Sequence, residues 1–242
     1  MGVACDLDPT LGLVDRKIGR GTRNLAQGPA MTRRQAVEAL KAGADVAQKE
    51  MERGLDILAV GEMGIGNTTP STAIASVLTG RPPEEIAGRG TGLNDEGLGR
   101  KIDAVNRGLA LNQPDAGDAV DVLAKVGGFE IGGMAGAMLA AAARGRPVMV
   151  DGFIATAAAM ISAALAPPIR PYLIAGHLSN ERGHRLMLDW LDLDPLLDLG
   201  MRLGEGTGAA LGFSLAEAAC KMLNAMATFA EAGLPCGAST GA

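Results

Sequence analysis

Short apolar runs alternate along this chain with longer segments whose apolar residues recur at helical spacing. Thr32 is a good N-cap for a helix over residues 33–53, and the apolar face of that helix is formed by Ala36, Leu40, Ala44, Ala47 and Met51. Further helices are expected from Pro70 to about residue 78, and over residues 100–112, 129–143, 154–165 and 206–232. Buried strands are expected over residues 55–60, 147–152 and 169–175.

This order of elements predicts the fold class. Strands that alternate with helices favour an α/β fold with a mostly parallel, Rossmann-like sheet and helices on both faces. A small helical portion from the chain termini is expected beside the sheet. We expect residues 1–29 to be loop and extended chain, and residues 1–242 to form one α/β domain. Residues 206–242 are expected to form a C-terminal helical segment that either joins a small domain or packs at a dimer interface.

Composition excludes several classes of protein. Apolar residues make up 48% of the chain but aromatic residues only 2%, so the core must consist of aliphatic side chains. The net charge of −5, without a basic block, argues against a nucleic-acid partner. No apolar run reaches the length of a membrane span, and no secretory signal is visible. The scattered Cys5, Cys220 and Cys236 form neither a disulfide framework nor a metal motif. We therefore expect a cytoplasmic protein without a metal or membrane partner.

The 35 glycines gather in loops that follow the predicted strands. Residues 61–69 form such a loop, and the helix after it presents free N–H groups that suit a phosphate. The loop alone leaves anion binding and an ordinary strand-to-helix turn open. A second glycine-rich stretch covers residues 88–93. Gly90 there can expose backbone N–H groups, and Lys101 is expected near a helix start, where an anion-binding role is less favoured than a solvated surface lysine.

Two glutamates are flanked by glycine. Glu205 lies in a stretch where three of five residues, 204–208, are glycine, which is costly if the segment only needs to begin a helix. Glu205 is either a helix-stabilising charge or a general base. Glu62 is likewise an isolated acidic residue, between Gly61 and Met63 at the end of the first strand. Of the two histidines, His177 is expected at a strand end where it can line the site, and His184 on a helix surface.

Several stretches together resemble one family over nearly the whole chain. They are GPAM at 28–31, GEMGIGNTTP at 61–70, KVGGFE at 125–130, DGF at 151–153, RPYLI at 170–174 and MRLGEGTGAAL at 201–211. The family is nicotinate-nucleotide–dimethylbenzimidazole phosphoribosyltransferase, a pentosyltransferase of cobalamin biosynthesis. The resemblance implies transfer of the phosphoribosyl group of nicotinate mononucleotide to 5,6-dimethylbenzimidazole, which gives α-ribazole 5′-phosphate and nicotinate. It also implies a homodimer, and that this chain is N-terminally shortened relative to the family.

The resemblance also implies roles for individual residues. Glu205 is expected to take the proton of the benzimidazole, with Glu62 in the same pocket. The remaining predicted substrate-binding residues belong to the glycine-rich stretches and strand ends: Gly64, Asn67, Thr68, Gly90, Lys101, Gly152, Ser179, Leu203 and Gly204. No cofactor is expected, and no metal is required because no pyrophosphate is displaced.

The chemistry of the implied reaction agrees with a single base. The pyridinium ring of nicotinate mononucleotide leaves as a neutral ring, so the main demand is a base for the attacking nitrogen, which contributes roughly 10²–10⁴-fold in rate. Two other readings stay open. One is a non-catalytic nucleotide-binding fragment that lacks part of the acceptor pocket. The other is an α/β sugar-phosphate enzyme of different specificity. The preferred acceptor base does not follow from the sequence.

Overall fold

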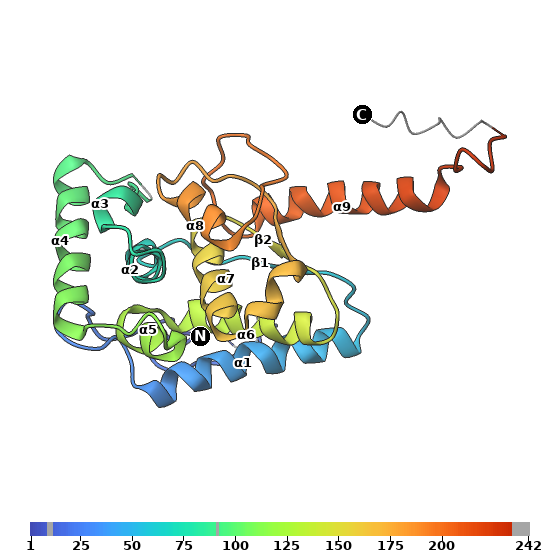
Figure 1. The fold of residues 1–242 in the computed structure, drawn as a ribbon. Coiled ribbons are helices and arrows are strands. Elements are labelled where there is room, and N and C mark those ends of the chain that lie inside the picture. The colour runs from blue at the N-terminus through green and yellow to red at the C-terminus, as the bar shows by residue number, and fades with distance from the viewer. Residues whose placement is uncertain (9–11, 91, 234–242) are drawn as a thin grey trace.

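The computed structural model describes residues 1–8, 12–90 and 92–233, and it has the expected α/β architecture (Figure 1). The described residues form a parallel sheet of three strands in the order β1-β2-β3, in which Val60 pairs with Val150 and Val150 with Ala175. The strands are β1 Leu58–Val60, β2 Val148–Val150 and β3 Leu173–Ala175. The helices are α1 Arg33–Glu52, α2 Thr68–Thr79, α3 Pro83–Ile86, α4 Asp95–Asn112, α5 Ala119–Val126, α6 Phe129–Ala143, α7 Phe153–Leu165, η2 Pro167–Tyr172, α8 His184–Leu191 and α9 Thr207–Ala225.

Side chains of the central strand β2 show how both faces of the sheet are covered. All three of its residues are buried. Val148 and Val150 belong to the main core, which includes residues of α6 and α7. Met149 points to the opposite face, where its sulfur lies close to Gly212 of α9. The first turns of α9 therefore cover the face that α6 and α7 leave free, which confirms helices on both faces.

Helices α1 and α6 approach each other through glycine. A Cβ on Gly43 of α1 would lie 1.8 Å from the Gly133 carbonyl oxygen, and one on Gly136 of α6 would lie 1.8 Å from the Leu40 carbonyl oxygen. The two backbones are therefore in direct contact. The start of α1 is fixed by a capping box, in which Thr32 and Gln35 each bond the other's backbone N–H, as the sequence predicts for Thr32.

Several element boundaries differ from the sequence predictions. Each strand is shorter than predicted, and the prolines at 167, 168 and 171 place the short helix η2 before β3, because proline cannot donate to a sheet ladder. Helix α4 begins at Asp95, five residues before the predicted start, because the Asn94 side chain accepts from the Gly97 N–H and caps the helix there. Helices α3 and α5 were not predicted, and for α8 only a helix at His184, without bounds, was expected. The described part of residues 1–29 is loop, as expected.

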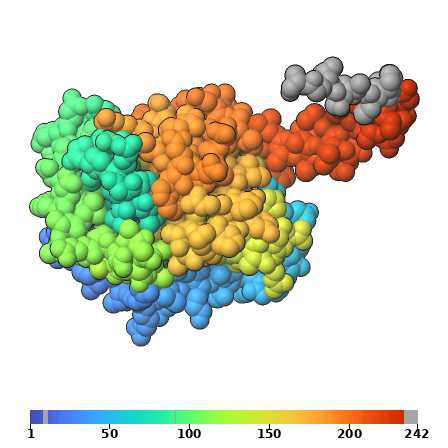
Figure 2. Space-filling view, in the orientation of Figure 1, coloured from blue at the N-terminus to red at the C-terminus, as the bar shows by residue number. Residues whose placement is uncertain are grey.

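Helix α9 stands out from the body of the molecule (Figures 1 and 2). It ends at Ala225, seven residues before the predicted end. Its buried residues lie only in its first turns, and large apolar side chains are exposed along its length, among them Leu211, Phe213, Leu215, Met222 and Leu223. The predicted C-terminal segment, residues 206–242, extends past the described residues, and Cys236 lies outside them. Among the described residues, no helix combines the length and apolar character needed to cross a membrane.

The contact between α1 and α6 gives a stability prediction. Gly43→Ala should lower the free energy of unfolding by at least about 2 kcal/mol, because the new methyl group would overlap the Gly133 carbonyl. Gly99→Ala on the exposed side of α4 is the matched control. No atom lies within 4 Å of its Cβ position, so it should raise stability by about 0.5–1 kcal/mol. Urea unfolding measures both, and equal effects of the two substitutions would contradict the close contact.

Candidate active site

A cavity of about 490 Å³ lies at the carboxyl ends of the three parallel strands, the place where open α/β sheets bind ligands. The loops after β1, β2 and β3 contribute to it, together with the segment before α9. Nine of the eleven predicted site residues line it: Glu62, Gly64, Thr68, Gly90, Gly152, Ser179, Leu203, Gly204 and Glu205. The fold therefore brings together residues that are separated by more than a hundred positions in the sequence.

The segment that carries Glu205 has an unusual backbone. Gly204, Glu205 and Gly206 have φ values of 78°, 59° and 78°, so three successive residues are left-handed. For Glu205, which has a Cβ, this conformation costs about 1–2 kcal/mol. The Glu205 N–H donates to the Glu62 carbonyl oxygen at 3.1 Å. The glycines of this stretch are thus explained by backbone geometry, and Glu205 is held directly beside the loop that carries Glu62.

The two loops touch through their backbones as well. A Cβ on Gly61 would lie 2.2 Å from the backbone nitrogen of Gly206, so no side chain fits at position 61. A Cβ on Gly204 would lie 2.9 Å from Glu62 Oε1. The glycines at 61 and 204 therefore permit the close approach of the two loops that carry Glu62 and Glu205.

The side chain of Asp151 holds this arrangement together, although no role for Asp151 was predicted from the sequence. Its carboxylate is 2% exposed and accepts three backbone N–H bonds from the start of α9. Gly206 donates to Oδ2 at 3.0 Å, and Gly208 and Ala209 donate to Oδ1 at 2.8 and 3.0 Å. Because α9 has only glycine at its own N-cap, Asp151 supplies the missing cap from the end of β2. The sequence signal that could have identified Asp151 is an acidic residue directly after a buried strand.

Glu62 is partly buried in the cavity wall. Asn67 Nδ2 donates to its Oε2 at 2.7 Å and also to the Met63 carbonyl oxygen at 3.1 Å, so Asn67 orients the glutamate. Asn67 does not line this cavity but lines a larger, neighbouring one. Burial raises the pKa of the Glu62 carboxyl, the Asn67 hydrogen bond opposes this, and Asp151 and Glu205 add to the rise. Glu62 is therefore closer to protonation than an exposed glutamate, and in its protonated form it can donate a hydrogen bond.

Lys101 lies elsewhere than predicted. It is in the interior of α4 rather than near its start, and it is only 6% exposed, so the surface interpretation is wrong. Its Nζ donates to the Gly88 carbonyl oxygen at 3.0 Å. Burial lowers the pKa of Lys101, and Glu181 opposes that effect. Lys101 thus supports the loop that carries Gly90 and does not line the cavity itself. Gly90 packs beside the Thr68 hydroxyl and has a φ of 53°.

The two histidines are both buried. His177 follows β3 and lines the cavity as expected, with 1% of its surface exposed. His184 is fully buried at the first position of α8, so its predicted place on a helix surface is wrong. Periodicity could not reveal this, because the hydrogen bonds that hold His184 come from the loop before α8, at Ser179, and from the distant helix α7, at Thr156. In the part of the chain that the structure describes, no three His, Cys, Asp or Glu residues are arranged to hold a metal ion.

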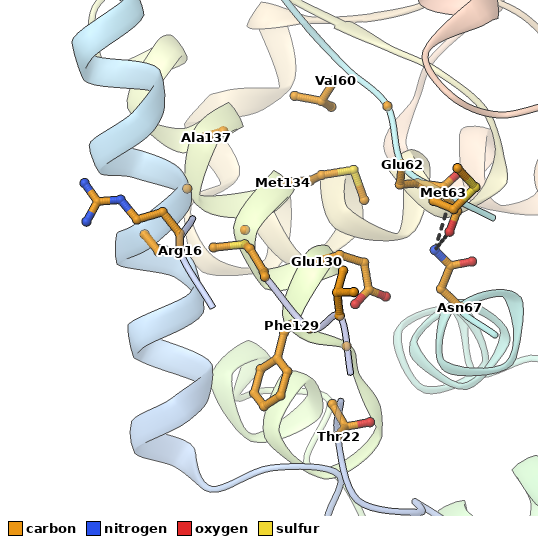
Figure 3. Close-up of a pocket in the computed structure, with 18 of the residues that line it drawn as sticks. Arg16, Thr22, Val60, Glu62, Met63, Asn67, Phe129, Glu130, Met134 and Ala137 are labelled. Carbon is orange, nitrogen blue, oxygen red and sulfur yellow. Dashed lines mark hydrogen bonds between the residues drawn. The ribbon is translucent and has the colours of Figure 1, made fainter. Parts of the chain in front are cut away.

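A second, larger cavity of about 970 Å³ adjoins the first and shares Glu62, Met63 and Ile65 with it (Figure 3). Its walls are mostly apolar, and Glu130 enters it from the start of α6. Burial raises the pKa of the Glu130 carboxyl, while its own backbone N–H and the amino group of residue 1 oppose this. Glu62 therefore stands between a cavity lined by glycine loops and a cavity lined by apolar side chains.

The role of Asp151 leads to a second prediction. Asp151→Asn replaces one acceptor oxygen with an N–H₂ group that faces a backbone donor of α9, so the free energy of unfolding should fall by about 1–3 kcal/mol. Asp118→Asn is the matched control, because Asp118 caps α5 at a partly exposed site and asparagine caps a helix equally well. The control should stay within about 1 kcal/mol of the parent. Urea unfolding of both variants checks this, and a neutral Asp151→Asn would show that the cap is dispensable.

Comparisons with known proteins agree with this geometry. The phosphoribosyltransferase family DBI_PRT matches residues 1–234. Proteins of Roseiflexus sp. (strain RS-1) and Desulforudis audaxviator (strain MP104C), both named nicotinate-nucleotide–dimethylbenzimidazole phosphoribosyltransferase, are each 57% identical to this chain over 234 residues. The match covers 97% of this chain and 66% of each relative, so the chain spans about two thirds of their length.

A solved structure gives the same result for the fold. The crystal structure of CobT from Thermus thermophilus superposes with a TM-score of 0.92 at 48% sequence identity. The superposition covers 98% of this chain and 70% of the CobT chain. At this identity and coverage the sequence and the fold point to one family. The chain belongs to the DBI_PRT family of phosphoribosyltransferases.

Proposed function

We propose that this chain transfers the phosphoribosyl group of nicotinate mononucleotide to 5,6-dimethylbenzimidazole, giving α-ribazole 5′-phosphate and nicotinate in cobalamin biosynthesis. The observation that carries the proposal is the placement of Glu205. An exposed carboxylate on a rigid left-handed turn faces a cavity at the strand ends, beside Glu62. The names of the similar proteins support the same activity.

In this proposal Glu205 is the general base. As the benzimidazole nitrogen attacks C1′ of the ribose, the ring gains positive charge, and the Glu205 carboxylate accepts the N–H proton. The nicotinate ring leaves with the electron pair of the broken glycosidic bond and becomes neutral at nitrogen. Glu62 lies at the junction of the two cavities, where it can hydrogen-bond the incoming ring. The remaining rate enhancement comes from holding both rings in line with C1′.

The glycine loops supply the nucleotide side of the site. We assign Gly64, Thr68, Gly90, Gly152 and Ser179 to the phosphoribosyl group, since they line the cavity around the start of α2, whose free N–H groups favour an anion. Leu203 and Gly204 form the wall next to Glu205. Two residues act from outside this cavity: Asn67, which lines the larger cavity, holds Glu62, and the buried Lys101 holds the loop of Gly90.

The base assignment predicts a specific loss of turnover. Glu205→Gln keeps the shape of the side chain but removes its basicity, so turnover should fall roughly 10²–10⁴-fold while nicotinate mononucleotide still binds. Glu217→Gln, on an exposed face of α9, is the matched control and should keep the parent rate. The assay follows nicotinate release and α-ribazole phosphate formation after both substrates are mixed with the chain.

Three results would count against the proposal. Turnover by Glu205→Gln at the parent rate would remove Glu205 from catalysis. A parent chain that binds the nucleotide without releasing nicotinate would be a nucleotide-binding fragment. Stabilisation by other sugar phosphates, but not by nicotinate mononucleotide, would indicate an enzyme of different specificity.

We further propose that the chain forms a homodimer in the cytoplasm, and that its parallel strands with their helical crossovers form a Rossmann-like sheet. The support for a dimer is the exposed apolar surface of α9, which a protein in water rarely leaves bare. The support for a cytoplasmic location is that Cys5 and Cys220, the free cysteines of the described residues, are exposed, which suits a reducing compartment.

The homodimer proposal can be tested by light scattering after size exclusion. The parent chain of 24.6 kDa should elute with twice that mass. Leu223→Lys places a charge at the most exposed apolar residue of α9 and should shift the population to monomer. Ser214→Lys adds the same charge at an exposed polar position of the helix and should not. A monomeric parent at micromolar concentration would contradict the proposal.

A further inference from the structure

A chain of hydrogen bonds through the buried His184 joins two loops of the candidate site. The Ser179 N–H donates to His184 Nδ1 at 2.8 Å. His184 Nε2 lies 2.8 Å from the Thr156 hydroxyl, and that hydroxyl donates to the Gly152 carbonyl oxygen at 2.8 Å. The chain therefore runs from the loop after β3, through α8 and α7, to the loop after β2.

The direction of each bond is determined by the number of available protons. His184 Nδ1 accepts from the Ser179 N–H, so it carries no proton. The single proton of the Thr156 hydroxyl is used at Gly152, so His184 Nε2 must be the donor to Thr156. A neutral ring with its proton on Nε2 satisfies every group. Burial, followed by His177 and Arg185, lowers the pKa of His184 to about 3, so the ring is neutral at physiological pH.

Both ends of this chain of hydrogen bonds lie in the candidate site. Gly152 and Ser179 line the same cavity, and a Cβ on Gly152 would lie 3.6 Å from the Ser179 Cβ. The position of His184 itself is fixed from behind. A Cβ on its neighbour Gly183 would lie 2.5 Å from the Ile86 carbonyl oxygen, so the start of α8 packs directly on the end of α3. His184 is thus anchored on one side and connected to both loops on the other.

We propose that His184, acting through Thr156, is a positioning residue that holds Gly152 and Ser179 at the spacing needed to bind the phosphoribosyl group. This inference rests on the proposed function, because it takes nicotinate mononucleotide as the ligand of these two residues. A buried hydrogen-bonded chain with every donor used has one preferred geometry. It therefore fixes the relation between two loops that no backbone hydrogen bond between Gly152 and Ser179 fixes directly.

The test uses Thr156, because valine keeps its shape and removes only the hydroxyl. Thr156→Val should weaken binding of nicotinate mononucleotide about tenfold, since it leaves the His184 Nε2–H without an acceptor. Thr156→Ser retains the hydroxyl and should restore most of the affinity. Calorimetric titration of the full 242-residue chain gives the dissociation constants without requiring turnover.

Ser162→Ala is the matched control. Ser162 is also a buried hydroxyl of α7, but it donates to Ala158 and Ala135, away from the site. Its removal should lower the melting temperature and leave the affinity for the nucleotide unchanged. If Ser162→Ala weakened binding as much as Thr156→Val, the effect would be general loss of stability, and the inference would be overturned. Parent-like affinity of Thr156→Val would also overturn it.

A measurement without nucleotide separates this inference from the proposed function. Nitrogen NMR of the His184 ring should show a neutral imidazole with its proton on Nε2. A proton on Nδ1 would break the chain of hydrogen bonds, whatever the protein binds. If the ring has the expected proton but the parent chain does not bind nicotinate mononucleotide, the proposed function fails, and the nucleotide role of His184 fails with it.

Discussion

The buried carboxylate of Asp151 is the interaction on which the candidate site depends. Asp151 directly follows the central strand β2, and its carboxylate accepts hydrogen bonds from three backbone N–H groups at the start of α9. A charge buried to this extent is tolerated only with such a set of donors. Because the donors are the first residues of α9, the sheet and the helix are joined at one point. Glu205 lies immediately before that point, so its position follows from the sheet.

The glycines around Glu205 serve the same junction. Three left-handed residues in a row allow the chain to turn sharply into α9, and the missing side chain of Gly61 lets the neighbouring loop touch the turn. The strain at Glu205 is of the order of the stability contributed by one or two hydrogen bonds. The hydrogen bonds of the Asp151 cap and the bond from the Glu205 N–H to the Glu62 carbonyl together contribute enough free energy to offset this strain. In its proposed role as the base, a carboxylate fixed in this way needs little reorganisation when substrates bind.

Local signals in the sequence predicted much of this structure. The cap at Thr32 located α1, and the glycine-rich ends of the strands located the cavity. The errors concern residues whose partners are distant. The local pattern favoured the surface for Lys101 and His184, and the family resemblance placed Lys101 among the substrate-binding residues. A loop carbonyl 13 residues away and a hydroxyl 28 residues away hold these two side chains inside, and Lys101 does not line the cavity. Asp151 was overlooked as a cap because its helix begins 56 positions later, at Thr207. Capping across such a distance leaves no local pattern.

Helix α9 connects two regions that are usually separate. One end is fixed to Asp151 next to Glu205, and the other end leaves the body of the molecule (Figure 1). The apolar side chains along this outer part are exposed. A helix of 19 residues is a stiff rod of about 28 Å. A load applied to the free end is therefore transmitted to the turn that carries Glu205. A surface that covers α9, such as the proposed dimer partner, would therefore act as a lever on Glu205, and the proposed quaternary contacts and the alignment of the proposed base would be mechanically coupled.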